Sequence, residues 1–201
     1  VFDQLTKKQL KDLKLNTDIQ RTDSMMACSN IRQYSRLQLL IEVLLRLWRI
    51  LSEEDKSILS TMFSDYTKKS SGQYLYKLKS SDIPHELDKV AQIYHYCHQH
   101  ILPNYAELDL YNIFERVYIE HFTIVEEKIQ LKNSSELHSN CLQSPDDVDA
   151  TYREKRKEDY HGQIINVVET ASPENTLNLI TDVAVATNNT DDSVILNKRI
   201  D

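Results

Sequence analysis

Five aspartates stand next to segments that the sequence predicts as strands: Asp23, Asp149, Asp182, Asp191 and Asp192. Carboxylates at strand ends can hold two Mg²⁺ ions for phosphoryl transfer, because hard cations take oxygen ligands and a strand fixes where each side chain projects. Each aspartate has an alternative role as a cap, a turn residue or a solvated side chain. The pattern therefore indicates a candidate carboxylate site but does not select its members.

A second group of potential ligands is His95, Cys97 and His98, in a segment of helical periodicity. Two histidines three residues apart on a helix can share a zinc ion. No second ligand pair at a familiar spacing follows elsewhere, so a polar helix face is the alternative interpretation. No GxSxG motif is present and no motif surrounds Cys28 or Cys141, so the sequence indicates no hydrolase triad.

A run of basic residues, Arg153, Lys155, Arg156 and Lys157, precedes Tyr160. Basic side chains beside an aromatic ring suit a nucleic-acid backbone, because they neutralise phosphates while the ring offers a stacking surface. A solvated loop is the alternative. These four residues are the candidate nucleic-acid contacts.

The elements that must position these residues change along the chain. Residues 162–170 and 177–185 are rich in β-branched side chains and flank a turn, which predicts a β-hairpin. A lone hairpin buries too little to be stable, and the candidate third strand is residues 19–27. A helix is expected to begin near residues 188–192, and another covers residues 2–13.

Between the first strand and the hairpin, apolar residues recur at helical spacing from about residue 32 to residue 140. Ser52, followed by three acidic residues, predicts a helix N-cap. Pro103 interrupts one helix, and residues 105–131 are predicted to form one long helix. The helical block thus interrupts a sheet that begins before it and resumes after it.

Composition and net charge limit the classes of protein to which the chain can belong. The 201 residues are 40% hydrophobic and 27% charged, enough to bury a core. Two glycines exclude a glycine-rich phosphate loop, and three cysteines without a CxxC motif favour a reducing compartment. The net charge of −7 is uneven, because residues 102–150 carry ten acidic and three basic side chains. A local basic surface that binds nucleic acid is therefore compatible with the negative net charge of the whole chain.

Several short blocks together resemble the catalytic domain of bacterial insertion-sequence DDE transposases, in the branch with a large helical insertion after the first strand. The blocks flank the helical segment and read QRTDS (20–24), SNIR (29–32), SRLQL (35–39), SPDDVDATYR (144–153), NVVET (166–170), PEN (173–175), LITDV (179–183) and NNTDD (188–192).

This resemblance implies an α+β fold: an incomplete ribonuclease H-like sheet, made of the first strand plus the β-hairpin, interrupted by a large all-α insertion. The chain then divides into residues 1–31 (N-terminal helix and first core strand), 32–140 (helical insertion) and 141–201 (β-hairpin and start of a core helix). Asp23 becomes the first catalytic and metal-binding acid, with the second Asp and the Glu expected beyond Asp201. We expect a fragment truncated at both ends and inactive by itself.

The resemblance also implies a function: metal-dependent DNA cleavage and strand transfer with two Mg²⁺ ions. The implied partners are transposon-end and target DNA, on which the protein forms homo-oligomers. The implied compartment is the bacterial cytoplasm. The alternative is a non-catalytic transposase remnant that binds DNA or mediates oligomerisation. A third hypothesis, an unrelated helical interaction protein with an appended hairpin, places Asp23 far from the hairpin. The first two place Asp23 on a central strand that pairs with residues 164–170.

Overall fold

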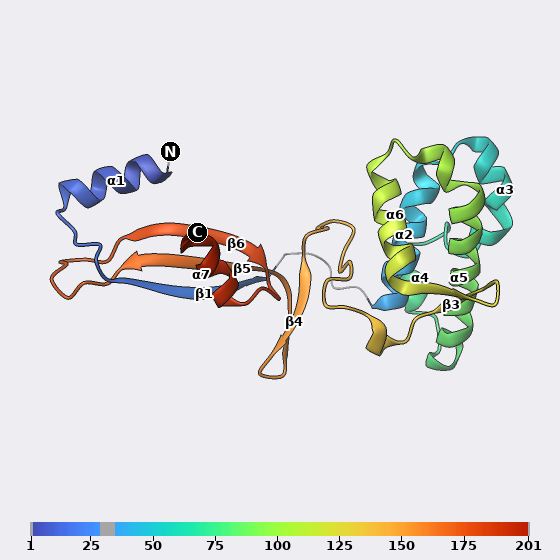
Figure 1. Ribbon diagram of the computed structural model, residues 1–201. Helices are drawn as coiled ribbons and strands as arrows, with labels where there is room; N and C mark the ends of the chain where they lie inside the picture. The colour runs from blue at the N-terminus through green and yellow to red at the C-terminus, as the bar shows by residue number, and fades with distance from the viewer. Residues whose placement is uncertain (1, 29–34, 201) are drawn as a thin grey trace. The chain divides into compact units, whose positions relative to one another are not determined.

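A computed structural model describes residues 2–28 and 35–200 of the chain (Figure 1). The fold is mixed α+β and its strands pair antiparallel. The described residues form two compact units. The sheet unit comprises those of 1–30 and 149–201, and the helical unit comprises those of 31–148.

The sheet unit contains four strands: β1 (Gln20–Cys28), β4 (Thr151–Lys155), β5 (Glu158–Thr170) and β6 (Ile180–Thr187). β5 is the central strand, because β1 pairs along one of its edges while β6 and β4 pair in succession along the other. Asp23 pairs with Val167 of β5. The predicted pairing is thus confirmed, and the separation of Asp23 from the hairpin is wrong.

The position of β1 within the sheet differs from the prediction. Among the described residues β1 has β5 as its sole neighbour and is an edge strand, not a central one. The burial pattern of β1 fits an edge strand, because only its residues 24, 26 and 27 are half-buried and the others are exposed.

Helix α7 (Asp192–Ile200) lies against one face of this sheet (Figure 1), where Arg199 contacts β5 and β6. This face contains Ile164 and Val168, both buried, and Ile195 of α7 is buried as well. The opposite face is largely open: Met25, Val183 and Val185 expose about half of their surface, at 57%, 45% and 59%. The sheet therefore has one face covered by a helix and one open face, on which apolar side chains lie beside Asp23 and the Arg21–Glu169 ion pair.

Helix α1 (Phe2–Asp12) belongs to the sheet unit and contacts β6. The linker after it is held to the β5–β6 connection, because the Asn16 amide donates to the side chain of Asn175 and that side chain donates back to the Asn16 carbonyl, at 2.7 and 2.9 Å. The predicted N-terminal helix is confirmed.

The helical unit contains α2 (Arg36–Ile50), α3 (Glu53–Phe63), α4 (Ser71–Leu75), α5 (Ile83–His100) and α6 (Asp109–His121), with short 3₁₀ turns Ser80–Asp82, Leu102–Tyr105 and Ser134–Glu136. Its core is centred on α2, where Leu40, Ile41, Val43, Leu44 and Leu47 have no exposed surface. Such continuous burial explains why the α2 segment reads as an apolar run with few charges. None of the described helices has the length and apolar content that crossing a membrane requires.

The predicted cap of α3 is confirmed: the Ser52 hydroxyl accepts a hydrogen bond from the Asp55 amide at 3.1 Å. The single helix over residues 105–131 is wrong. Helix α6 ends at His121, and β2 (Phe122–Val125) and β3 (Lys128–Leu131) form a hairpin. Three consecutive β-branched residues, 123–125, favour a strand, and the turn residues Glu126 and Glu127 adopt positive φ.

Residues 141–148 lie with the helical unit. The Arg116 guanidinium donates to the carbonyls of Val148 and Asn140, at 2.6 and 2.7 Å, and its partner Glu120 accepts from the Leu142 amide at 2.8 Å. One arginine–glutamate pair on α6 therefore fixes the segment that leads back to the sheet.

Candidate functional site

Asp23 occupies the middle of β1 and its side chain is exposed. Its neighbours Thr22 and Ser24 contact Asn166 on the α7 side of the sheet. Because side chains alternate along a strand, Asp23 projects from the opposite, open face. One carboxylate oxygen accepts from the Ser24 amide at 2.8 Å, which leaves the rest of the group directed to solvent.

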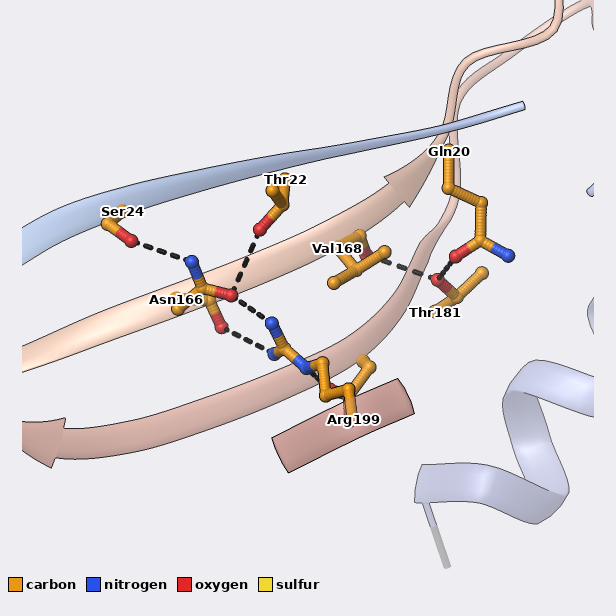
Figure 2. A network of polar contacts seen from close by, with 8 residues as sticks. Gln20, Thr22, Ser24, Asn166, Val168, Thr181 and Arg199 are labelled. Atoms are coloured by element: carbon orange, nitrogen blue, oxygen red, sulfur yellow. Dashed lines mark hydrogen bonds and ion pairs between the residues drawn. The ribbon is translucent and has the colours of Figure 1, made fainter. Parts of the chain in front are cut away.

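The strand that carries Asp23 is fixed by a polar network around Asn166 of β5 (Figure 2). The Asn166 side chain, 2% exposed, donates to the Ser24 hydroxyl at 2.6 Å and accepts from the Thr22 hydroxyl at 3.0 Å. Arg199 of α7 donates to the same side-chain oxygen and, at 3.3 Å, to the Asn166 carbonyl. One buried amide thus joins β1, β5 and α7 directly beneath Asp23.

Arg199 extends this network to β6, because its Nε donates to the Asp182 carboxylate at 2.5 Å. The guanidinium is mostly buried and is compensated by Asp182, as a buried charge requires. Neither Asn166 nor Arg199 was among the residues predicted for the site. The sequence does distinguish Asn166, because it is the one polar residue in the apolar run 164–168.

The other predicted aspartates do not join Asp23. Asp182 is bound to Arg199, Asp191 lies 3.9 Å from Arg153, and Asp192 begins α7. Asp149 is exposed in the segment before β4. Across residues 2–28 and 35–200, no three His, Cys, Asp or Glu side chains are grouped as a metal site requires. Asp23 is thus a lone carboxylate, and the described residues do not fit a site for two Mg²⁺ ions.

The histidine–cysteine cluster of α5 contacts α6 rather than forming a ligand set. His95 Nδ1 lies 3.0 Å from the Tyr118 hydroxyl, and His98 Nε2 lies 2.9 Å from the Glu115 carboxylate. Cys97 is buried, and this burial raises the pKa of its thiol to about 12, so it stays protonated. The two histidines thus belong to a polar face of α5, the alternative to zinc, and this face contacts α6.

The basic run forms a hairpin with β5. Arg156 and Lys157 make the two-residue turn, with φ of 57° and 67°, and Lys155 precedes it; all three are exposed. Arg153 differs, because its guanidinium donates to the Asn188 carbonyl at 2.9 Å and lies near Asp191. Three of the four candidate contacts are therefore available at the hairpin tip, and Arg153 holds the hairpin to the β6–α7 connection.

The block 29–32 of the resemblance lies outside the described residues, and the other blocks lie in both units. Comparison of the chain with protein-family models, with curated proteins and with solved structures found no match in any of the three. The geometry and the sequence resemblance together are the basis for a functional assignment.

Proposed function

We propose that this chain is part of a DNA transposase of the DDE class, with Asp23 as the first of three catalytic acids. The observation that carries the proposal is the pairing of Asp23 in β1 with Val167 in β5, two strands that are separated in the sequence by the residues of the helical unit. The antiparallel strands β1, β5 and β6, followed in the chain by α7, support the proposal that the sheet is the start of a ribonuclease H-like core, to which β4 is an addition. The proposal places the remaining Asp and Glu beyond residue 201.

The local geometry suits a metal-binding carboxylate. Asp23 sits on a strand whose backbone is fixed from below by Asn166 and Arg199, while its side chain meets solvent on the open face. A ligand on a fixed strand loses little conformational freedom when a cation binds. In the complete enzyme, Mg²⁺ supplies the activation of water and of the transferred phosphate.

The exposed tip of the β4–β5 hairpin is the proposed DNA contact within the sheet unit. Lys155, Arg156 and Lys157 project there without the internal carbonyl contacts that occupy Arg153. We propose that this tip binds transposon-end or target DNA. We also propose that the protein forms homo-oligomers on that DNA and acts in the bacterial cytoplasm.

The test is a strand-transfer assay on the protein translated from the complete reading frame, with Mg²⁺ and duplexes carrying the ends of the element that encodes it. Asp23→Asn is expected to abolish both cleavage and transfer and to leave DNA binding intact. The matched control is Asp18→Asn, an exposed aspartate before β1, which should retain both activities. Full activity of Asp23→Asn would refute the catalytic assignment.

A second candidate function is a non-catalytic module that binds DNA or mediates oligomerisation. The open apolar face containing Met25, Val183 and Val185 favours it, because exposed apolar surface of this kind marks protein contacts. A complete protein that self-associates and binds DNA but shows no Mg²⁺-dependent cleavage would select this function over the catalytic one.

A further inference from the structure

A patch of positive charge lies in the helical unit, on residues that none of the assignments above uses. Residues 66–81 contain four lysines and no Asp or Glu, although the whole chain has a net charge of −7. All four, Lys68, Lys69, Lys77 and Lys79, are exposed. We call Lys68, Lys69, Lys77 and the neighbouring Tyr76 the lysine patch.

The lysine patch lines two adjoining hollows around α4. One, of about 480 Å³, is bounded by Lys69, Gly72, Tyr76 and Lys77, among others. The second, of about 410 Å³, also contains Lys69 and Lys77 and adds Lys68. The two hollows share Lys69 and Lys77, so these two lysines line both parts of the depression around α4.

Positive charge exceeds negative charge around this depression, where Asp65 is the one acidic side chain among the lining residues that the structure describes. Among the described residues, none of the patch lysines forms an ion pair with a carboxylate. The nearby Asp65 is held at 2.6 Å by Lys89, and this contact lowers the pKa of Asp65. The positive charge of Lys77 lowers the pKa of Lys69, because two ammonium groups close together repel each other. A bound anion would relieve this repulsion.

The backbone that presents the lysines is anchored on both sides. Before α4, Tyr66 is buried and donates a hydrogen bond to the buried Glu86 of α5. At the start of α4, Ser71 is buried and donates to Glu42 of α2 at 2.9 Å. Leu75 and Leu78, on either side of Tyr76 and Lys77, pack against the core of the unit. The backbone that carries the lysines is therefore fixed by the fold.

Tyr76 adds a feature that simple anion binding does not need. It is 92% exposed, the highest exposure given for any large hydrophobic residue of the chain, and it directly precedes Lys77. An aromatic ring in water beside lysines is the arrangement that binds single-stranded nucleic acid, where bases stack on rings and cations follow the backbone. Duplex binding leaves such a ring unused, because paired bases are already stacked.

We propose that the lysine patch binds single-stranded DNA, with Lys69 and Lys77 on successive phosphates, Lys68 beside them, and an unpaired base stacked on Tyr76. The choice of DNA rests on the proposed function, whereas the recognition of phosphates and a base rests on the patch itself. The helical unit thereby contacts an unpaired stretch of the substrate independently of the β4–β5 hairpin.

The test is fluorescence anisotropy of the complete chain with a labelled oligothymidylate, across a salt series. Lys69→Gln/Lys77→Gln is expected to lower affinity about tenfold and to reduce the slope of log K against log salt by about 1.4, since each phosphate contact on a single strand contributes about 0.7. Tyr76→Ala should lower affinity about tenfold at an unchanged slope, and Tyr76→Phe should retain it. The matched control Lys7→Gln/Lys8→Gln removes two exposed charges from α1 and should leave the affinity unchanged.

Equal affinity of wild type and patch variants would overturn the proposal, as would equal loss in the α1 control. Tighter binding of oligouridylate, or binding of anionic phosphatidylserine vesicles lost in the same variants, would overturn the assignment to DNA. Circular dichroism of each variant confirms folding. If strand transfer fails in the complete protein while the patch variants still lose oligothymidylate, the proposed function falls and the patch as a nucleic-acid site stands.

Discussion

Replacing Asn166 by Val tests whether the network beneath Asp23 holds the sheet unit together. The substitution places a β-branched residue, which suits a strand, at this position and removes every side-chain hydrogen bond of the buried amide. Arg199 loses a charge-assisted bond worth about 1.5–3 kcal/mol, and the half-buried Ser24 loses a neutral one worth about 1 kcal/mol. Thr22 is exposed, so water replaces its bond at little cost.

The added apolar burial of valine offsets about 1 kcal/mol of this loss. The net destabilisation is therefore about 1.5–3 kcal/mol, which corresponds to about 10- to 150-fold faster amide exchange where exchange reports opening of the sheet. The assay must be local, because the single tryptophan, Trp48, lies in the helical unit and does not report on β1.

Hydrogen–deuterium exchange read by mass spectrometry supplies this resolution. Peptides covering β1 and β5 should lose protection by the stated factor, while peptides of α2 should be unchanged and serve as an internal control. Thr22→Val, which removes one exposed bond, should change exchange only a few-fold. Unchanged protection of β1 in Asn166→Val, or an equal effect in α2, would refute the assigned role of the network.

Three further predictions concern buried groups of the helical unit and the exposed edge of the sheet. Tyr66→Phe removes one of two hydroxyl donors to the buried Glu86 carboxylate, the other being Tyr74, and should lower the free energy of unfolding by about 1.5–3 kcal/mol in urea titrations followed by tryptophan fluorescence. His121 is held neutral, because burial and two neighbouring cations lower its pKa to about 4. Its folded pKa lies below the ordinary value, so its contribution to stability is present above about pH 6.5 and is lost as the pH falls toward 4, by up to about 3 kcal/mol. Urea titrations at pH 7, 5.5 and 4 measure this dependence, and His121→Gln should flatten it. Among the cysteines, exposed Cys28 should react with a thiol reagent in the native protein, whereas buried Cys97, with its pKa raised to about 12, should react only after unfolding.

Each of these predictions has an outcome that contradicts it. Wild-type stability of Tyr66→Phe would show that water or another donor satisfies Glu86. A His121→Gln variant as acid-sensitive as the wild type would assign the pH dependence to other groups. Rapid labelling of Cys97 in the folded state would show that α5 opens on the time scale of the reaction.

Much of the element order follows from local pattern. Strand β1, the β5–β6 hairpin and the helices of the central block match the predicted segments, because β-branched runs and 3.6-residue periodicity are properties of short windows. Ser52 was assignable as a cap because its chemistry involves residues within one turn. The change from helix to hairpin after His121 was missed, although residues 123–125 are β-branched, since apolar spacing alone fits both structures.

What the sequence by itself determined is the identity of most segments, five candidate aspartates and a basic run that contains Arg156. Only the family resemblance singled out Asp23 among the five. Tertiary structure alone decided which residues meet: Asn166 with Arg199 beneath Asp23, Arg153 with the β6–α7 connection, and Lys69 with Lys77 across α4. The physical reason is the distance along the sequence over which each kind of interaction acts. Propensity, capping and turn chemistry act within a few residues, whereas buried hydrogen bonds and uncompensated charge depend on side chains brought together by packing.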